Sequence, residues 1–225
     1  MTAPSTSTGS ARGGLLTGGI AAIVFAVLFV VGFLMVSDSP DGDESNLKWF
    51  RYYANSDNRR QIVIGVILLT LAAIAFLIFL GVLRERLRSA AAGSEWISTV
   101  TFASGLVFVA MLAVFALGQG SVAASVAFGD APVPRDADLM RTFVSAGFGA
   151  MLLFGATAAG LLIFTTSLVS GRASLLPKWL VVSGYVAAVI VFLGGLLFLP
   201  IVLFLLWMLV LGIVLIARSR STAIA

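Results

Sequence analysis

The stretch LLTGGIAAIVFAVLFVVGFLMV, residues 15–36, contains no charged side chain. As an α-helix rising about 1.5 Å per residue it extends for about 33 Å, which exceeds the roughly 30 Å hydrocarbon core of a bilayer. A cleaved signal peptide is the alternative, but its apolar region is shorter and ends at a small-residue cleavage site, whereas Ser37 and Asp38 follow here. The stretch therefore predicts an uncleaved transmembrane helix.

The composition of the whole chain agrees with this first run. Hydrophobic residues make up 60% of its 225 residues and charged residues only 11%. A soluble domain with this composition would expose large apolar patches to water, so lipid is the predicted solvent. The 14 basic and 10 acidic residues lie mostly between apolar runs. This distribution indicates a role in membrane topology and argues against a nucleic-acid partner.

Further apolar runs follow along the chain. The last tract, residues 180–217, would form a helix of about 60 Å, twice the hydrocarbon thickness, so Gly194, Gly195 and Pro200 are expected to break it. The predicted fold is all-α: a polytopic membrane helix bundle of six transmembrane helices in three hairpins, with a short interfacial helix between the first two. The predicted parts are a flexible cytoplasmic tail at 1–14, a membrane domain at 15–217 with helices at 15–36, 62–83, 99–117, 143–166, 180–195 and 199–217, and a cytoplasmic tail at 218–225.

An even number of spans places both termini on one side of the membrane. Lysine and arginine accumulate on the cytoplasmic side, so the more basic set of segments should be internal. Lys48, Arg51, Arg59 and Arg60, which follow the first span, oppose this orientation. With cytoplasmic termini, the inner segments hold Arg12, Arg84, Arg86, Arg88, Arg172, Lys178, Arg218 and Arg220.

Residues 46–54, NLKWFRYYA, interleave aromatic and basic side chains. At about 100° per residue the aromatic residues share one side of a helix and the basic ones share the other. This segregation predicts an interfacial helix that anchors the protein at headgroup depth. The alternative is a cap over the outer ends of the bundle, in which the same rings contact protein. The predicted anchor residues are Trp49, Phe50, Tyr52 and Tyr53.

The residue types needed for catalysis or metal binding are scarce. The chain has no Cys and no His, which excludes thiolate chemistry and removes the commonest general base and metal ligand. The acidic connection at 38–44 lacks the ligand spacing of a calcium loop, which favours a solvated turn. We expect no catalytic residue, no metal and no cofactor.

Arg84, Arg86 and Arg88 follow the second apolar run without a helix breaker. Arg84 and Arg88 are one turn apart and could contact lipid phosphates of the cytoplasmic leaflet, at about 1 kcal/mol per charge. The alternative is a topology signal alone, because lipid-specific clusters usually contain more basic residues.

Asp136 is expected to cap the helix that contains the fourth apolar run. That run is rich in small residues, and small residues four positions apart let helix backbones approach closely in lipid. A substrate-lining groove is the alternative, but the run contains no acid, base or amide. The predicted packing residues of this central helix are Gly155, Ala156, Ala159 and Gly160.

Four short segments carry a family resemblance: WFRYYAN at 49–55, FLGVLR at 79–84, FGDAP at 128–132 and LPKWL at 176–180. On these segments the chain resembles a family of uncharacterised six-helix integral membrane proteins common in actinobacteria. The resemblance implies a multi-pass protein of a bacterial plasma membrane and implies no catalytic activity.

The function that fits these features is that of a structural or accessory subunit rather than an enzyme. Membrane lipids, another membrane protein or a second copy of the chain are the expected partners. A transporter or passive pore for lipid or a small solute is the alternative, although every charge lies near a helix end and no proton-relay residue is visible.

Overall fold

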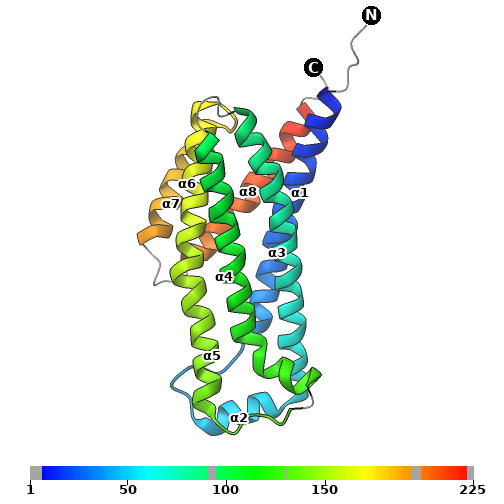
Figure 1. The fold of residues 1–225 in the computed structure, drawn as a ribbon, viewed down its shortest axis with the longest axis vertical. Coiled ribbons are helices and arrows are strands. Elements are labelled where there is room, and N and C mark those ends of the chain that lie inside the picture. The colour runs from blue at the N-terminus through cyan, green and yellow to red at the C-terminus, as the bar shows by residue number, and fades with distance from the viewer. Residues whose placement is uncertain (1–6, 91–94, 130, 194–198, 222–225) are drawn as a thin grey trace, which may run out of the picture.

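The computed structural model describes residues 7–90, 95–129, 131–193 and 199–221, and these residues form helices joined by turns, with no strand among them (Figure 1). The elements are α1 (Ser7–Val36), α2 (Asn46–Ala54), α3 (Ser56–Ala90), α4 (Glu95–Phe128), α5 (Ala137–Gly149), the π-helix η1 (Ala150–Gly155), α6 (Ala156–Arg172), α7 (Lys178–Leu193) and α8 (Leu199–Ser221). The all-α fold agrees with the prediction.

Within the described residues, five helices are long and apolar enough to cross a membrane. They are α1, α3, α4, the continuous helix Ala137–Arg172 formed by α5, η1 and α6, and α8. The first helix begins at Ser7 rather than at Leu15, and the fourth continues to Arg172 rather than ending at residue 166. Asp136 caps α5 as predicted, because its side chain accepts hydrogen bonds from the backbone of Asp138 and Leu139.

The two ends of the bundle differ. Ser7 and Ser221, the first and last described residues, lie at one end, which we name the termini end, whereas α2 lies across the opposite α2 end (Figure 1). Helix α1 packs against α3 and α8, α3 against α4, α4 against the α5–η1–α6 helix, and α6 against α7. The helices therefore follow one another around the bundle, and α8 closes it against α1.

Glycines bring the backbones of neighbouring helices together at three places. A Cβ on Gly32 of α1 would lie 2.9 Å from the carbonyl oxygen of Gly65 of α3. A Cβ on Gly19 of α1 would similarly lie 2.8 Å from the carbonyl oxygen of Gly212 of α8. Gly118 of α4 meets the backbone of α5 in the same way. Only a residue without a side chain fits these contacts.

The predicted packing residues Gly155, Ala156, Ala159 and Gly160 are all buried. Gly160 faces α7, where a Cβ would lie 3.1 Å from Cγ1 of Val191. Gly155 ends η1, and its nearest neighbour is the flexible Met151 side chain of the same helix. The closest backbone approaches therefore lie on α1, α3, α4, α5 and α8, outside this predicted set.

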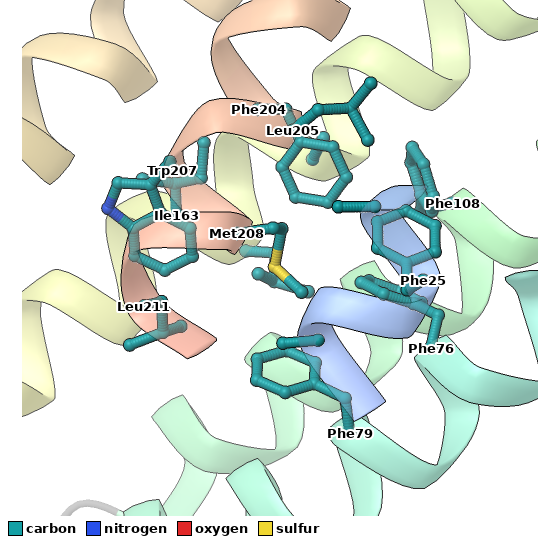
Figure 2. Close-up of a cluster of buried hydrophobic side chains, with 14 of the residues drawn as sticks. Phe25, Phe76, Phe79, Phe108, Ile163, Phe204, Leu205, Trp207, Met208 and Leu211 are labelled. Atoms are coloured by element: carbon teal, nitrogen blue, oxygen red, sulfur yellow. The ribbon is translucent and has the colours of Figure 1, made fainter. Parts of the chain in front are cut away.

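The center of the bundle is filled by four phenylalanines, which we name the phenylalanine plug: Phe25, Phe76, Phe108 and Phe204 (Figure 2). Each comes from a different helix, and all are fully buried. Their ring centroids are 4.7 to 6.0 Å apart, a spacing typical of favourable aromatic pairs. These mutual ring contacts fill the space between the four helices at this depth.

The last two helices reach only half-way along the bundle, which differs from the prediction. Phe204, near the start of α8, lies in the plug, at the middle of α3 and α4. Val191, near the end of α7, lies beside Gly160 in the middle of the Ala137–Arg172 helix. Figure 1 shows both helices beside the half that leads to the termini end. At 16 residues, α7 is also only about 24 Å long.

Six membrane-crossing helices are therefore not confirmed. Helix α8 is long enough to cross, but its first residues lie at mid-depth, so the α7–α8 pair enters and leaves the bundle at the termini end. Four helices run the full length, and this even number also places both termini at one end.

The glycine contact between α1 and α3 gives a matched pair of variants. Gly65→Leu should destabilise the protein by about 1–3 kcal/mol, the usual cost of overpacking, because its side chain would meet Val36 and the backbone of Gly32. Gly81→Leu on the same helix has open space around its Cβ and should be neutral or slightly stabilising. Thermal aggregation in detergent measures the stability of both variants. Equal melting of the two variants would contradict the close α1–α3 contact.

Candidate functional site

A cavity of about 430 Å³ lies at the termini end, between α1, α3, α6, α8 and the connection that precedes α7. Its polar lining residues are Arg86, Arg218, Thr166 and Ser170, and every other described residue that lines it is a leucine. We name it the termini-end cavity. It combines two cationic groups with apolar walls and has no acidic residue among its described lining.

The two arginines come from two different helices, α3 and α8. Arg86 of α3 reaches toward α1, where its Nη2 lies 3.8 Å from the position of a Cβ on Gly14. Arg218 of α8 donates a hydrogen bond from Nη1 to the backbone oxygen of Leu175. This bond ties the end of α8 to the connection between α6 and α7, and it places a second guanidinium group beside the cavity.

The hydroxyl groups line the wall contributed by α6. Thr166 is 0% exposed and Ser170, one turn nearer the termini end, is 2% exposed. The Thr166 hydroxyl has no hydrogen-bond partner among the described residues. Its neighbour Thr165, in contrast, donates to Leu161 at 2.8 Å. A buried hydroxyl without a partner is unusual, and polar groups at membrane depth commonly mark function.

A second polar pair lies behind this wall. The Ser167 hydroxyl and the Trp207 indole N–H are buried without a partner among the described residues. Both approach Gly184 of α7, where Ser167 Oγ occupies the space of a Cβ and Trp207 Nε1 is 3.2 Å from that position. Gly184 is therefore needed for α7 to pack against α6 and α8.

One layer of side chains lies between the termini-end cavity and the phenylalanine plug. Leu83 and Leu211 line its wall, and one turn deeper lie Phe79 on α3 and Met208 and Trp207 on α8 (Figure 2). The Phe79 ring is 5.9 Å from that of Phe76, a member of the plug. The phenylalanine plug and this layer therefore lie between the termini-end cavity and the α2 half of the bundle.

The structure separates the three arginines that the sequence grouped. Arg86 lines the cavity, whereas the guanidinium carbon of Arg84 lies 4.8 Å from the ring centroid of Phe102. Arg88 is exposed and lies 4.0 Å from the carboxylate of Glu95. Contact of Arg84 and Arg88 with lipid phosphate stays a prediction. Arg218 was not part of the predicted site, because its distance from Arg86 along the sequence gave no sign that the two residues line one cavity.

The hydroxyls were also missed. The predicted fourth span ended at residue 166 and the next began at residue 180, so Thr166 and Ser170 fell at or beyond a boundary. Helix α6 in fact continues to Arg172, and both side chains are turned inward. Four hydroxyl residues between 165 and 170 were the available signal.

The aromatic helix α2 forms a cap at the α2 end. Trp49 is 1% exposed and Tyr53 0% exposed, and both pack against residues of α3, α4 and α5. The indole of Trp49 donates to the Asp41 carbonyl at 3.2 Å, and the Arg141 guanidinium lies 5.7 Å from its ring centroid. For these two rings the lipid-anchor prediction is wrong and the cap alternative holds. Phe50 and Tyr52 are half-buried, so their contact with lipid stays a prediction.

The acidic connection before α2 supports this cap. Glu44 pairs with Lys48, and this hydrogen bond is the main cause that raises the pKa of Lys48. Arg141 of α5 donates to the backbone oxygen of Glu44. The connection is therefore tied to both α2 and α5.

Burial also changes the acidity of the cap tyrosines. It raises the pKa of Tyr52 to about 12, with a smaller contribution from Asp38, and it raises the pKa of Tyr53 further. Both phenols are neutral in the folded protein at physiological pH.

No protein-family model, curated protein or solved structure matches the chain. Function therefore has to be inferred from the geometry of the two ends.

The cap tyrosines predict a loss of stability at alkaline pH. Because the folded pKa of Tyr52 is above its ordinary value of 10.0, the stabilisation is complete below pH 10 and is lost as the pH rises toward about 12. In a Tyr185→Phe variant, which leaves Tyr52 and Tyr53 as the only tyrosines, tyrosinate absorbance should titrate well above pH 10. Trp49→Ala should lower that midpoint and the exposed control Trp96→Ala should not. If the two cap tyrosines of the Tyr185→Phe variant titrate near pH 10 without any change to Trp49, the cap is open to solvent and the prediction is wrong.

Proposed function

We propose that this protein is a non-enzymatic accessory protein of a bacterial plasma membrane, which acts by binding and does not conduct a solute. The observation that carries the proposal is the arrangement along the bundle: a lined cavity lies at the termini end, and the buried phenylalanine plug lies between it and the α2 half. A closed center supports binding over transport.

The positions of charged residues support the same conclusion. Between Arg60 and Arg84 of α3, and from Trp96 to Phe128 of α4, no charged residue occurs. Ion-coupled and proton-coupled transporters place acids, bases or unwound helices near the membrane midplane. A passive pore, the remaining alternative, would require movement of the plug phenylalanines.

The chemistry of the cavity supports a non-catalytic role. Thr166 and Ser170 offer hydroxyl groups, but a hydroxyl nucleophile needs a base beside it. Neither a carboxylate nor a lysine is among the described lining residues, and the chain has no histidine. We therefore assign the hydroxyls to hydrogen bonding with a bound molecule.

The expected partners of an accessory protein are membrane lipids and another membrane protein, or a second copy of this chain. The α2 cap supports a role in assembly, because it orders the outer loops into one surface. Leu47, Lys48 and Arg51 are exposed on that surface, opposite the buried Trp49 and Tyr53.

The orientation can be tested with fusion proteins. We predict that the termini end is cytoplasmic, because the helix ends there hold Arg84, Arg172 and Arg218. A green fluorescent protein fused after Ala225 should fluoresce, and alkaline phosphatase fused there should be inactive. Phosphatase fused at Gly42, in the connection before α2, should be active. The reverse pattern would place the cavity on the outer side.

A flux measurement tests the non-conducting role. Proteoliposomes that contain the purified protein should release entrapped K⁺ or glycerol no faster than empty liposomes. Valinomycin serves as the positive control for K⁺ release. Protein-dependent, saturable flux of either solute would overturn the proposed function.

A further inference from the structure

We propose that the termini-end cavity binds one single-chain anionic amphiphile, a monoacyl phosphate ester of the lysophosphatidic acid type. Its acidic headgroup lies between Arg86 and Arg218, and its acyl chain extends along the leucines toward the plug. This inference rests on the proposed binding function and names the chemical class that the site accepts.

The headgroup assignment follows from the two guanidinium groups. Each presents N–H donors in a planar fork that matches phosphate or carboxylate oxygens, and such charge-assisted bonds are among the strongest in proteins. Arg86 of α3 and Arg218 of α8 line the same cavity, so an anion bound there would be within reach of guanidinium groups from two helices. No described lining residue is acidic, so none of these residues repels an anion.

The tail assignment follows from the size and lining of the cavity. Its volume of about 430 Å³ falls within the range of ligand pockets. If a non-hydrogen atom needs roughly the 30 Å³ of a liquid water molecule, the cavity holds on the order of a dozen such atoms, headgroup included. The part that the headgroup leaves has room for one chain and none for a second. Leucines from α1, α3 and α8 form the walls that such a chain would contact.

The unpartnered hydroxyl of Thr166 favours one kind of single-chain anionic amphiphile, a molecule with an ester group. Thr166 lies one turn deeper than Ser170, on the path from the arginines to the plug, and its buried hydroxyl has no partner among the described residues. A ligand with an ester carbonyl between headgroup and chain would accept this hydrogen bond. A simple soap or alkyl phosphate has no oxygen at that depth.

Native mass spectrometry of the purified protein in a neutral maltoside detergent tests the proposal. Lauroyl lysophosphatidic acid should bind one molecule per chain. Three control compounds should each bind at least about tenfold more weakly than lauroyl lysophosphatidic acid. They are monolaurin, which lacks the phosphate; inorganic phosphate, which lacks the chain; and dilauroyl phosphatidic acid, which has two chains. Equal binding of monolaurin or of the two-chain lipid would overturn the assignment.

Two variants locate the site. Arg86→Gln should weaken binding by about tenfold or more, as expected for the loss of a charge-assisted contact. Leu215→Trp changes no charge and should weaken binding similarly by filling the cavity. The matched control Arg88→Gln removes an exposed arginine outside the cavity and should bind like the unmodified protein. Each variant is first checked by thermal unfolding and size-exclusion chromatography.

These experiments distinguish a failure of the ligand assignment from a failure of the proposed accessory function. If Arg88→Gln weakens binding as much as Arg86→Gln, or if Leu215→Trp binds normally, the amphiphile lies on the surface and the proposal fails. Such a failure does not bear on the prediction that the protein conducts no solute. If the proteoliposomes conduct a solute but lysophosphatidic acid still binds with the expected variant pattern, the ligand class stands and the accessory function fails.

Discussion

Direct contact between helix backbones is the constraint on which the rest of this structure depends. Lipid is as apolar as leucine, so burial against another helix gains little, and close van der Waals packing has to hold the helices together. Gly32 and Gly65 join α1 to α3, and Gly19 and Gly212 join α1 to α8. Helix α1 is thereby held against two neighbours at two depths, and the positions of α3 and α8 follow from it.

The half-length α7–α8 pair gives the bundle two different cross-sections. Near the α2 end the bundle consists of α1, α3, α4 and α5, and aromatic rings such as Phe33, Phe115 and Phe148 fill the space between them. Near the termini end, α6, α7 and α8 join α1, α3 and α4. A wider ring leaves more space at its center, and the termini-end cavity occupies this space. The phenylalanine plug lies where the two cross-sections meet.

The two ends of the molecule therefore have different characters. At the α2 end, a short helix closes the bundle with buried rings, and its Trp49 and Lys48 side chains donate hydrogen bonds to Asp41 and Glu44 of the preceding connection. At the termini end, arginines and hydroxyls surround a hollow lined by leucine. A chain with such an asymmetry is suited to receive a molecule from one side only. This agrees with a binding role.

Local features of the chain were predictable because they depend on neighbours in sequence. The helical runs, the cap at Asp136 and the amphipathic α2 follow from hydropathy, hydrogen-bonding capacity and periodicity over a few residues. Helix ends were less predictable. Two polar segments outside the predicted spans are helical: Ser7–Gly14 and Ser167–Arg172. A helix can continue past an apolar run because it satisfies its own backbone hydrogen bonds there.

The sequence by itself determined the class of this protein: long apolar helices, basic residues at their ends, and no residue type suited to thiolate or imidazole chemistry. The tertiary structure alone decided that α8 begins at mid-depth, that Trp49 faces protein, and that Arg86 and Arg218 share a cavity. The physical reason is that hydropathy reports the preference of a residue for lipid or protein over water. It does not distinguish lipid from protein, and it contains no information about which helices meet.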